Sequence, residues 1–166
     1  MRPHLVALLS AALVSAESHP GEPCEIAQHR EFDFVIGNWL VRDSSGQAVG
    51  TATIARAFGG CVLVETWLGV GSAGESLGII GYEPDRGRWR REFLDPSGVT
   101  LMLEGRLNGA AMVMTGKEYP ADGVQMHRVT WTPTREGPVE QRWQTSADGG
   151  RSWQIRFYGL YQRIAE

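Results

Sequence analysis

Several polar side chains of this sequence stand two positions away from a tryptophan. Glu65 is two residues from Trp67, and Arg91 is two residues from Trp89. In an extended chain, residues two apart point to the same side. A few hydrogen-bonding groups among apolar aromatic side chains are typical of a small-molecule pocket. The sequence therefore predicts a ligand-binding set made of Glu65, Trp67, Trp89, Arg91, His127, Trp131, Gln141 and Trp143.

Glu65 and His127 also allow other interpretations. Glu65 with Arg91 or Arg128 is a candidate for a buried ion pair that holds the fold together. Either Glu65 or His127 is a candidate acid–base group for an isomerase or a hydrolase. His127 is also a candidate haem or metal ligand, although no second ligand stands at ligand spacing from it, and a hydrogen-bonded structural histidine is the simpler interpretation.

No catalytic residue, cofactor or metal site is predicted. The sequence contains no G-x-S-x-G motif, no CxxC and no His/Cys cluster at metal-ligand spacing. Residues 69–74 match G-x-G-x-x-G, but a Gly-punctuated, strand-like stretch follows them. A dinucleotide site needs a helix at that point, so a loop at the rim of the fold is favoured.

The elements that would position these side chains are strand-like segments separated by turn signals. Pairs such as Asn108-Gly109 and Asp122-Gly123 tolerate the backbone of tight hairpins. The segments recur about every ten to twelve residues and alternate in polarity; they are 38–43, 49–57, 61–69, 76–83, 88–94, 98–107, 110–119, 124–133, 138–146 and 152–163. Such a series predicts an all-β fold, a single closed antiparallel meander barrel of about ten strands, because closure removes the unpaired edges.

The last segment shows the expected alternation. In 152–163, one face would carry Trp153, Ile155, Phe157, Gly159 and Tyr161. Faces rich in aromatic residues are expected to line the interior of the barrel.

The chain begins with a predicted signal peptide, residues 1–16. An apolar run from Leu5 to Val14 precedes the small residues Ser15 and Ala16, and the run is too short to span a bilayer. The protein is therefore expected to be secreted or periplasmic after cleavage near Ala16. Residues 17–31 are predicted to form a lead-in with a short helix, and residues 32–166 the barrel.

Cys24 and Cys61 are the two cysteines of the chain. In an oxidising compartment an even pair usually forms a disulfide, with two free thiols as the alternative. A bridge would tie the lead-in to the third strand and stabilise the fold by about 3–4 kcal/mol.

The net charge of −3 argues against nucleic acid and against anionic membrane surfaces as partners. No segment after the signal peptide is apolar enough to span a membrane. The expected partner is a small, partly apolar molecule, and the expected assembly is a monomer or a homodimer.

Residues 146–153, read as SADGGRSW, resemble the Asp-box turn of sialidase-type propellers. In that turn the aspartate organises the hairpin and the tryptophan packs beneath it. A propeller needs the motif in every blade, and one copy is present. Asp148 and Trp153 are therefore predicted to be structural.

The sequence from FDFVIGNW at residues 32–39 onward is similar to a bacterial family of secreted or cytoplasmic domains of unknown function with a calycin-type, lipocalin-like barrel. The resemblance rests on residues 32–39, 60–67, 74–77, 89–95, 128–131, 146–153 and 161–163. It departs at Val35, where an aromatic residue would be expected. The likeness implies a fold and no particular activity.

In lipocalins the tryptophan of the Gly-x-Trp step closes one end of the barrel beneath an arginine of the last strand. The resemblance implies structural roles of this kind for Gly37, Trp39 and Arg163, with Arg156 as the alternative arginine. A more distant likeness to nitrobindin-type haem barrels implies His127 as the axial ligand.

Overall fold

The computed structural model describes residues 24–71, 74–98 and 100–164. The predicted signal peptide lies outside the described residues. The chain within them consists of ten strands and four short 3-10 turns.

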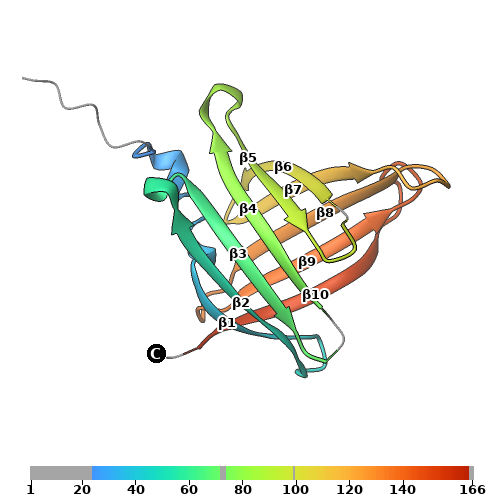
Figure 1. Cartoon of the computed structure of the whole chain (residues 1–166), viewed down its shortest axis with the longest axis horizontal. Helices are drawn as coiled ribbons and strands as arrows, with labels where there is room; N and C mark the ends of the chain where they lie inside the picture. The colour runs from blue at the N-terminus through green and yellow to red at the C-terminus, as the bar shows by residue number, and fades with distance from the viewer. Residues whose placement is uncertain (1–23, 72–73, 99, 165–166) are drawn as a thin grey trace, which may run out of the picture.

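The ten strands close into one antiparallel barrel in which each strand pairs with its neighbours in sequence and β1 pairs with β10 (Figure 1). This confirms the predicted all-β meander. The strands are β1 Gly37–Arg42, β2 Ala48–Ala57, β3 Val62–Gly69, β4 Glu75–Glu83, β5 Arg88–Leu94, β6 Thr100–Asn108, β7 Ala111–Glu118, β8 Gln125–Pro133, β9 Val139–Ser146 and β10 Gln154–Arg163. The 3-10 turns are η1 Ala27–Arg30, η2 Asp33–Val35, η3 Phe58–Gly60 and η4 Pro84–Arg86.

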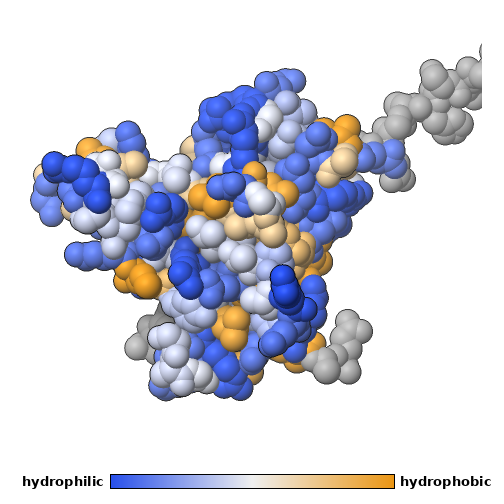
Figure 2. All heavy atoms as spheres, turned by 180° about the vertical axis from the view of Figure 1, so that it is seen from behind, coloured by the Kyte–Doolittle hydropathy of each residue, from blue (hydrophilic) through white to orange (hydrophobic). Residues whose placement is uncertain are grey.

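Alternation of side chains sorts the strands into an inner and an outer face. Leu63 and Glu65 of β3 are buried, and so are Val129 and Trp131 of β8. The outer face carries polar and charged residues together with separate groups of apolar ones, and most of the face seen in Figure 2 is hydrophilic. Among the described residues, no helix is both long and apolar enough to cross a membrane.

The segment that precedes β1, with η1, Phe32 and η2, closes one end of the barrel. Phe32, between η1 and η2, is fully buried and packs edge-on against Trp89 and Trp131, with ring centroids 5.6 Å and 5.3 Å away. The indole of Trp89 also donates a hydrogen bond to Glu31. These large aromatic side chains fill the barrel at this end, so a cavity can form only toward the opposite end.

The Gly37-x-Trp39 step lies at the same closed end. The Trp39 indole N–H donates to the carbonyl of Val35 at 2.8 Å, and the Arg163 guanidinium covers the ring at 4.4 Å from its centroid. Arg163 also donates to the carbonyl of Ile36. Gly37 has a φ of 148°, which favours glycine, and a Cβ there would lie 2.4 Å from an Arg163 nitrogen, so a larger residue would also push the guanidinium aside.

The predicted disulfide is present between Cys24 and Cys61. It joins Cys24 of the lead-in to the connection between β2 and β3, beside which the N-terminal turns lie in Figure 1. The bridge therefore fixes the segment that carries Phe32 to the barrel wall.

The hairpin between β9 and β10 is organised by Asp148. Its carboxylate accepts hydrogen bonds from the backbone N–H groups of Arg151 and Ser152 and from the Ser152 hydroxyl. These hydrogen bonds lower the pKa of Asp148 to about 2. Trp153 donates to the carbonyl of Gly150 and lies under Arg128.

The predicted alternation in 152–163 is wrong before Phe157. The pairing of β9 with β10 shifts register between Ile155 and Phe157, which marks a β-bulge. Ile155 is 64 % exposed instead of inward. The bulge brings both Arg156 and Phe157 to the cavity described below.

Candidate functional site

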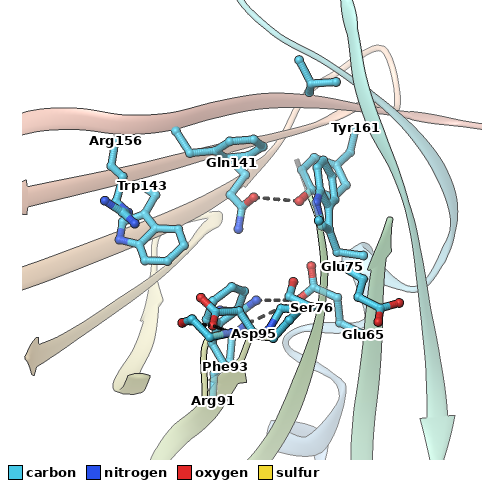
Figure 3. A pocket seen from close by; sticks show the side chains of 16 residues that line it. Glu65, Glu75, Ser76, Arg91, Phe93, Asp95, Gln141, Trp143, Arg156 and Tyr161 are labelled. Carbon is cyan, nitrogen blue, oxygen red and sulfur yellow. Dashed lines mark hydrogen bonds and ion pairs between the residues drawn. The ribbon is translucent and has the colours of Figure 1, made fainter. Parts of the chain in front are cut away.

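A cavity of about 700 Å³ lies inside the barrel, away from the end that Phe32 fills. Figure 3 shows the side chains that line it. Its walls come from six strands, β2 to β5, β9 and β10, and from the connections after β3 and β5. The strand residues that line it are Val49, Glu65, Trp67, Glu75, Ser76, Arg91, Phe93, Gln141, Trp143, Arg156, Phe157 and Tyr161, together with Gly74, Asp95, Pro96 and Ser97 from the connections. The volume is within the range of pockets that bind small molecules.

Five of the eight predicted ligand-binding residues meet in this cavity. They are Glu65, Trp67, Arg91, Gln141 and Trp143. The other three lie elsewhere: Trp89 and Trp131 pack on Phe32 at the closed end, and His127 is buried behind Trp143. Periodicity placed all eight on inner faces but did not reveal at which depth along the barrel axis each one sits.

The polar base of the cavity contains an ion pair between Glu65 and Arg91. Oε2 of Glu65 accepts from Nη2 of Arg91 at 2.7 Å and from Nε at 3.3 Å. Both side chains are about as buried as the apolar core, with 5 % and 4 % of their surface exposed. Removing either partner would leave an unpaired charge away from water, which is costly. Arg128, the alternative partner of Glu65, instead bonds Gln144 on the outer face.

Aromatic rings and a glycine complete the surroundings of this ion pair. The guanidinium of Arg91 lies 5.1 Å from the ring centroid of Phe93 and 5.4 Å from that of Trp131. Gly78 of β4 pairs directly with Glu65 of β3. A Cβ on Gly78 would lie 2.9 Å from Oε2 of Glu65 and 3.3 Å from Nε of Arg91, so the missing side chain makes room for the pair.

Gln141 and Tyr161 form the second polar group of the base. The Tyr161 hydroxyl donates to Oε1 of Gln141 at 2.7 Å. Burial raises the pKa of Tyr161 well above 10, the nearby Glu65 carboxylate raises it further, and Arg91 opposes the shift. The amide nitrogen of Gln141 points away from Tyr161 toward the open part of the cavity (Figure 3). The base thus presents an N–H donor to an occupant.

Two edge-to-face aromatic pairs line the cavity above this polar base. Trp67 packs on Phe157 with centroids 5.7 Å apart, and Phe93 packs on Trp143 with centroids 5.4 Å apart. Arg156 lies over the Trp143 ring at 5.4 Å. Aromatic walls of this kind favour flat, apolar occupants, which can contact the ring faces and edges.

His127 supports one of these walls from behind. The Trp143 indole N–H donates to Nδ1 of His127 at 2.9 Å, and Nε2 of His127 lies 3.0 Å from Oε2 of Glu118. An indole nitrogen can only donate, so Nδ1 is unprotonated and Nε2 carries the hydrogen that Glu118 accepts. Both ring nitrogens are thus engaged.

The sequence interpretation missed Phe93, Arg156, Phe157 and Tyr161 as cavity residues. Phe93 shares the inner face of its strand with Arg91, and Tyr161 was predicted to lie on the inner face of the last strand. Adding the neighbouring inner-face residues to the predicted ligand-binding set would have included both. Arg156 had no such signal, because the bulge that turns it toward the cavity interrupts the alternation.

Within the described part of the chain, no three His, Cys, Asp or Glu side chains are grouped so that they could hold a metal ion. A scan of protein-family models finds none that matches the chain, and a search of curated proteins finds no matching relative.

Proposed function

We propose that this protein binds a small, uncharged, partly apolar molecule in the open end of its barrel. The observation that carries the proposal is the arrangement of the cavity, in which a polar base lies beneath aromatic walls. The ligand would place a flat apolar body between the aromatic pairs and a hydrogen-bond acceptor, such as a carbonyl oxygen, against the Gln141 amide.

The charges around the cavity favour an uncharged ligand. Glu65 and Arg91 neutralise each other at the base. A charged group brought to that depth would lose its water without gaining a free counter-charge there. Carboxylates also outnumber guanidinium groups among the lining residues, which disfavours an anion.

The alternatives have less support. An acid–base role would fall to Glu65, since His127 is not among the lining residues, and Glu65 is held in its ion pair with Arg91. Haem ligation by His127 would require the loss of its hydrogen bond to Trp143 or to Glu118.

We further propose that the protein works in an oxidising compartment, secreted or periplasmic. The Cys24–Cys61 disulfide supports this, because such bonds persist where thiols are not kept reduced. We also propose that the chain is related to the calycin-type family of domains that its sequence resembles.

Titration with the fluorescent naphthalene ketone prodan tests the binding proposal. Prodan is flat and uncharged, carries one carbonyl acceptor, and shifts its emission to the blue in an apolar site. Saturable binding is expected, and Gln141→Leu is expected to weaken it about tenfold through the loss of one buried hydrogen bond.

Gln144→Leu is the matched control, since Gln144 lies on the same strand but bonds Arg128 on the outer face. It should leave the affinity for prodan unchanged. The fluorescent fatty acid cis-parinarate is the competing ligand type. Binding of cis-parinarate without binding of prodan would contradict the proposal, and so would equal affinities in wild type and Gln141→Leu.

A further inference from the structure

We propose that His127 is a positioning residue that holds Trp143 in the cavity wall only while its imidazole is neutral, so that acidification releases the ligand. The part that concerns the ligand rests on the function proposed above. The part that concerns Trp143 does not, and it can be measured on the empty protein.

The argument begins with the hydrogen bond between the two residues. Trp143 lines the cavity, and its indole N–H donates to Nδ1 of His127 at 2.9 Å. The His127 side chain is only 2 % exposed. Water therefore has little room to replace this acceptor if it is lost, and an unpaired indole N–H would be left in a buried place.

Protonation removes the acceptor. A neutral imidazole has one lone pair for a hydrogen bond, whereas an imidazolium donates from both nitrogens. Protonated Nδ1 and the Trp143 N–H would then be two donors 2.9 Å apart. The contact becomes repulsive, and we expect Trp143 to move, because it is only partly buried and its ring also contacts Phe93 and the guanidinium of Arg156.

The charged groups around His127 determine when this happens. Glu118 of β7 faces Nε2, and Arg156 of β10 acts from the side of the cavity; Trp143 of β9 is uncharged. Burial lowers the pKa of His127 below 6.5, Glu118 opposes this by its charge and its hydrogen bond, and Arg156 lowers the pKa further. The imidazole is therefore neutral at neutral pH and gains its proton below pH 6.5.

Movement of Trp143 would change the wall that a flat ligand contacts. Trp143 supplies one ring of the Phe93–Trp143 pair and carries Arg156 on its face. Loss of this wall removes ring contacts from the ligand while the polar base at Glu65, Arg91 and Gln141 stays in place. The result is weaker binding without unfolding of the barrel.

The first experiment follows the indole N–H resonance of Trp143 in ¹⁵N-labelled protein without ligand, from about pH 8 to about pH 5. The resonance is assigned by its absence in Trp143→Phe. It is expected to shift as His127 gains its proton, while the other indole resonances stay constant. A Trp143 resonance that stays constant over this range, or that changes only with cooperative unfolding, would overturn the proposal.

The second experiment measures prodan affinity over the same range. Wild type is expected to lose about tenfold in affinity, the equivalent of one hydrogen bond. His127→Asn places an uncharged amide oxygen near the position of Nδ1, and it should keep the affinity at acid pH. His127→Leu fills similar space without an acceptor, and it should bind weakly at every pH.

The variants separate positioning from a merely structural role. A His127→Asn protein with the same pH profile as wild type would overturn the proposal, because the titrating group would lie elsewhere. Absence of prodan binding together with a pH-dependent Trp143 resonance would contradict the proposed function and leave the His127–Trp143 coupling supported.

Discussion

Gly78 stands directly opposite Glu65 in the pairing of β3 with β4, and its missing side chain leaves the space in which the carboxylate meets Arg91. A residue without a functional group thereby shapes the polar base of the cavity. The ion pair can therefore be perturbed by a substitution at Gly78, without a change to either charged residue.

Gly78→Ala is expected to destabilise the fold by about 1–3 kcal/mol, because the added methyl group would press on the Glu65–Arg91 pair. Prodan affinity should fall as well. Urea denaturation followed by tryptophan fluorescence measures the free energy of unfolding. Gly81→Ala on the same strand is the control, since nothing lies within 4 Å of a Cβ there; equal effects of the two substitutions would refute the steric explanation.

Glu65→Gln is expected to lower the free energy of unfolding by about 3–5 kcal/mol, since it leaves the Arg91 charge buried without its partner. The double variant Glu65→Leu with Arg91→Met should recover most of this loss, because no unpaired charge remains. Arg142→Gln disrupts the more exposed pair with Glu140 and should cost less than about 1 kcal/mol. A double variant as unstable as Glu65→Gln would argue against a purely electrostatic penalty.

Tyr161 is expected to make the fold less stable in alkaline solution. Its pKa in the folded protein is well above 10, mainly because it is buried, whereas the unfolded chain releases the proton near pH 10. Deprotonation therefore stabilises the unfolded state first. As the pH rises above 10, the free energy of unfolding falls by about 1.4 kcal/mol per pH unit. Tyr161→Phe should remove this part of the slope in urea denaturation.

Tyr119→Phe provides the comparison for that slope. Tyr119 is largely exposed, so its substitution should leave the alkaline loss of stability as it is in wild type. Identical slopes in Tyr161→Phe and wild type would show that the hydroxyl is not the group responsible.

Reduction of the Cys24–Cys61 disulfide is expected to lower the free energy of unfolding by about 3–4 kcal/mol, because the bond restricts a long loop in the unfolded chain. The double variant Cys24→Ser with Cys61→Ser should match the reduced protein and be indifferent to reductant. A reduced protein as stable as the oxidised one would mean that non-covalent contacts, such as those of Phe32 and Glu31 with Trp89, are enough to hold the N-terminal segment in place.

The strands were predictable because turn chemistry and alternation are local signals. Each of the ten predicted segments overlaps one observed strand, and the disulfide followed from the number of cysteines. The inner faces were also predictable, as Glu65 and Arg91 show.

The depth of each side chain along the barrel was not predictable. Trp89 and Arg91 are two residues apart on one face of β5, yet the first fills the closed end and the second reaches the cavity. Strand periodicity does not specify how far along the barrel axis a side chain lies. That distance depends on the tilt of the strands and on which end of the barrel the N-terminal segment closes. His127 was recognisable as buried, but its role behind Trp143 depends on the register of β8 with β9.

The pairing of β1 with β10 has a consequence for the order of folding. Every other strand pairing in the barrel joins strands that are consecutive in sequence, so the contacts of those pairings close short loops. The β1–β10 pairing instead joins Trp39 to Arg163 across nearly the whole described chain. Closing so long a loop costs the most chain entropy, and contacts of this kind slow folding. We expect the β1–β10 seam to form last, with the Arg163 side chain settling on Trp39 as the barrel shuts.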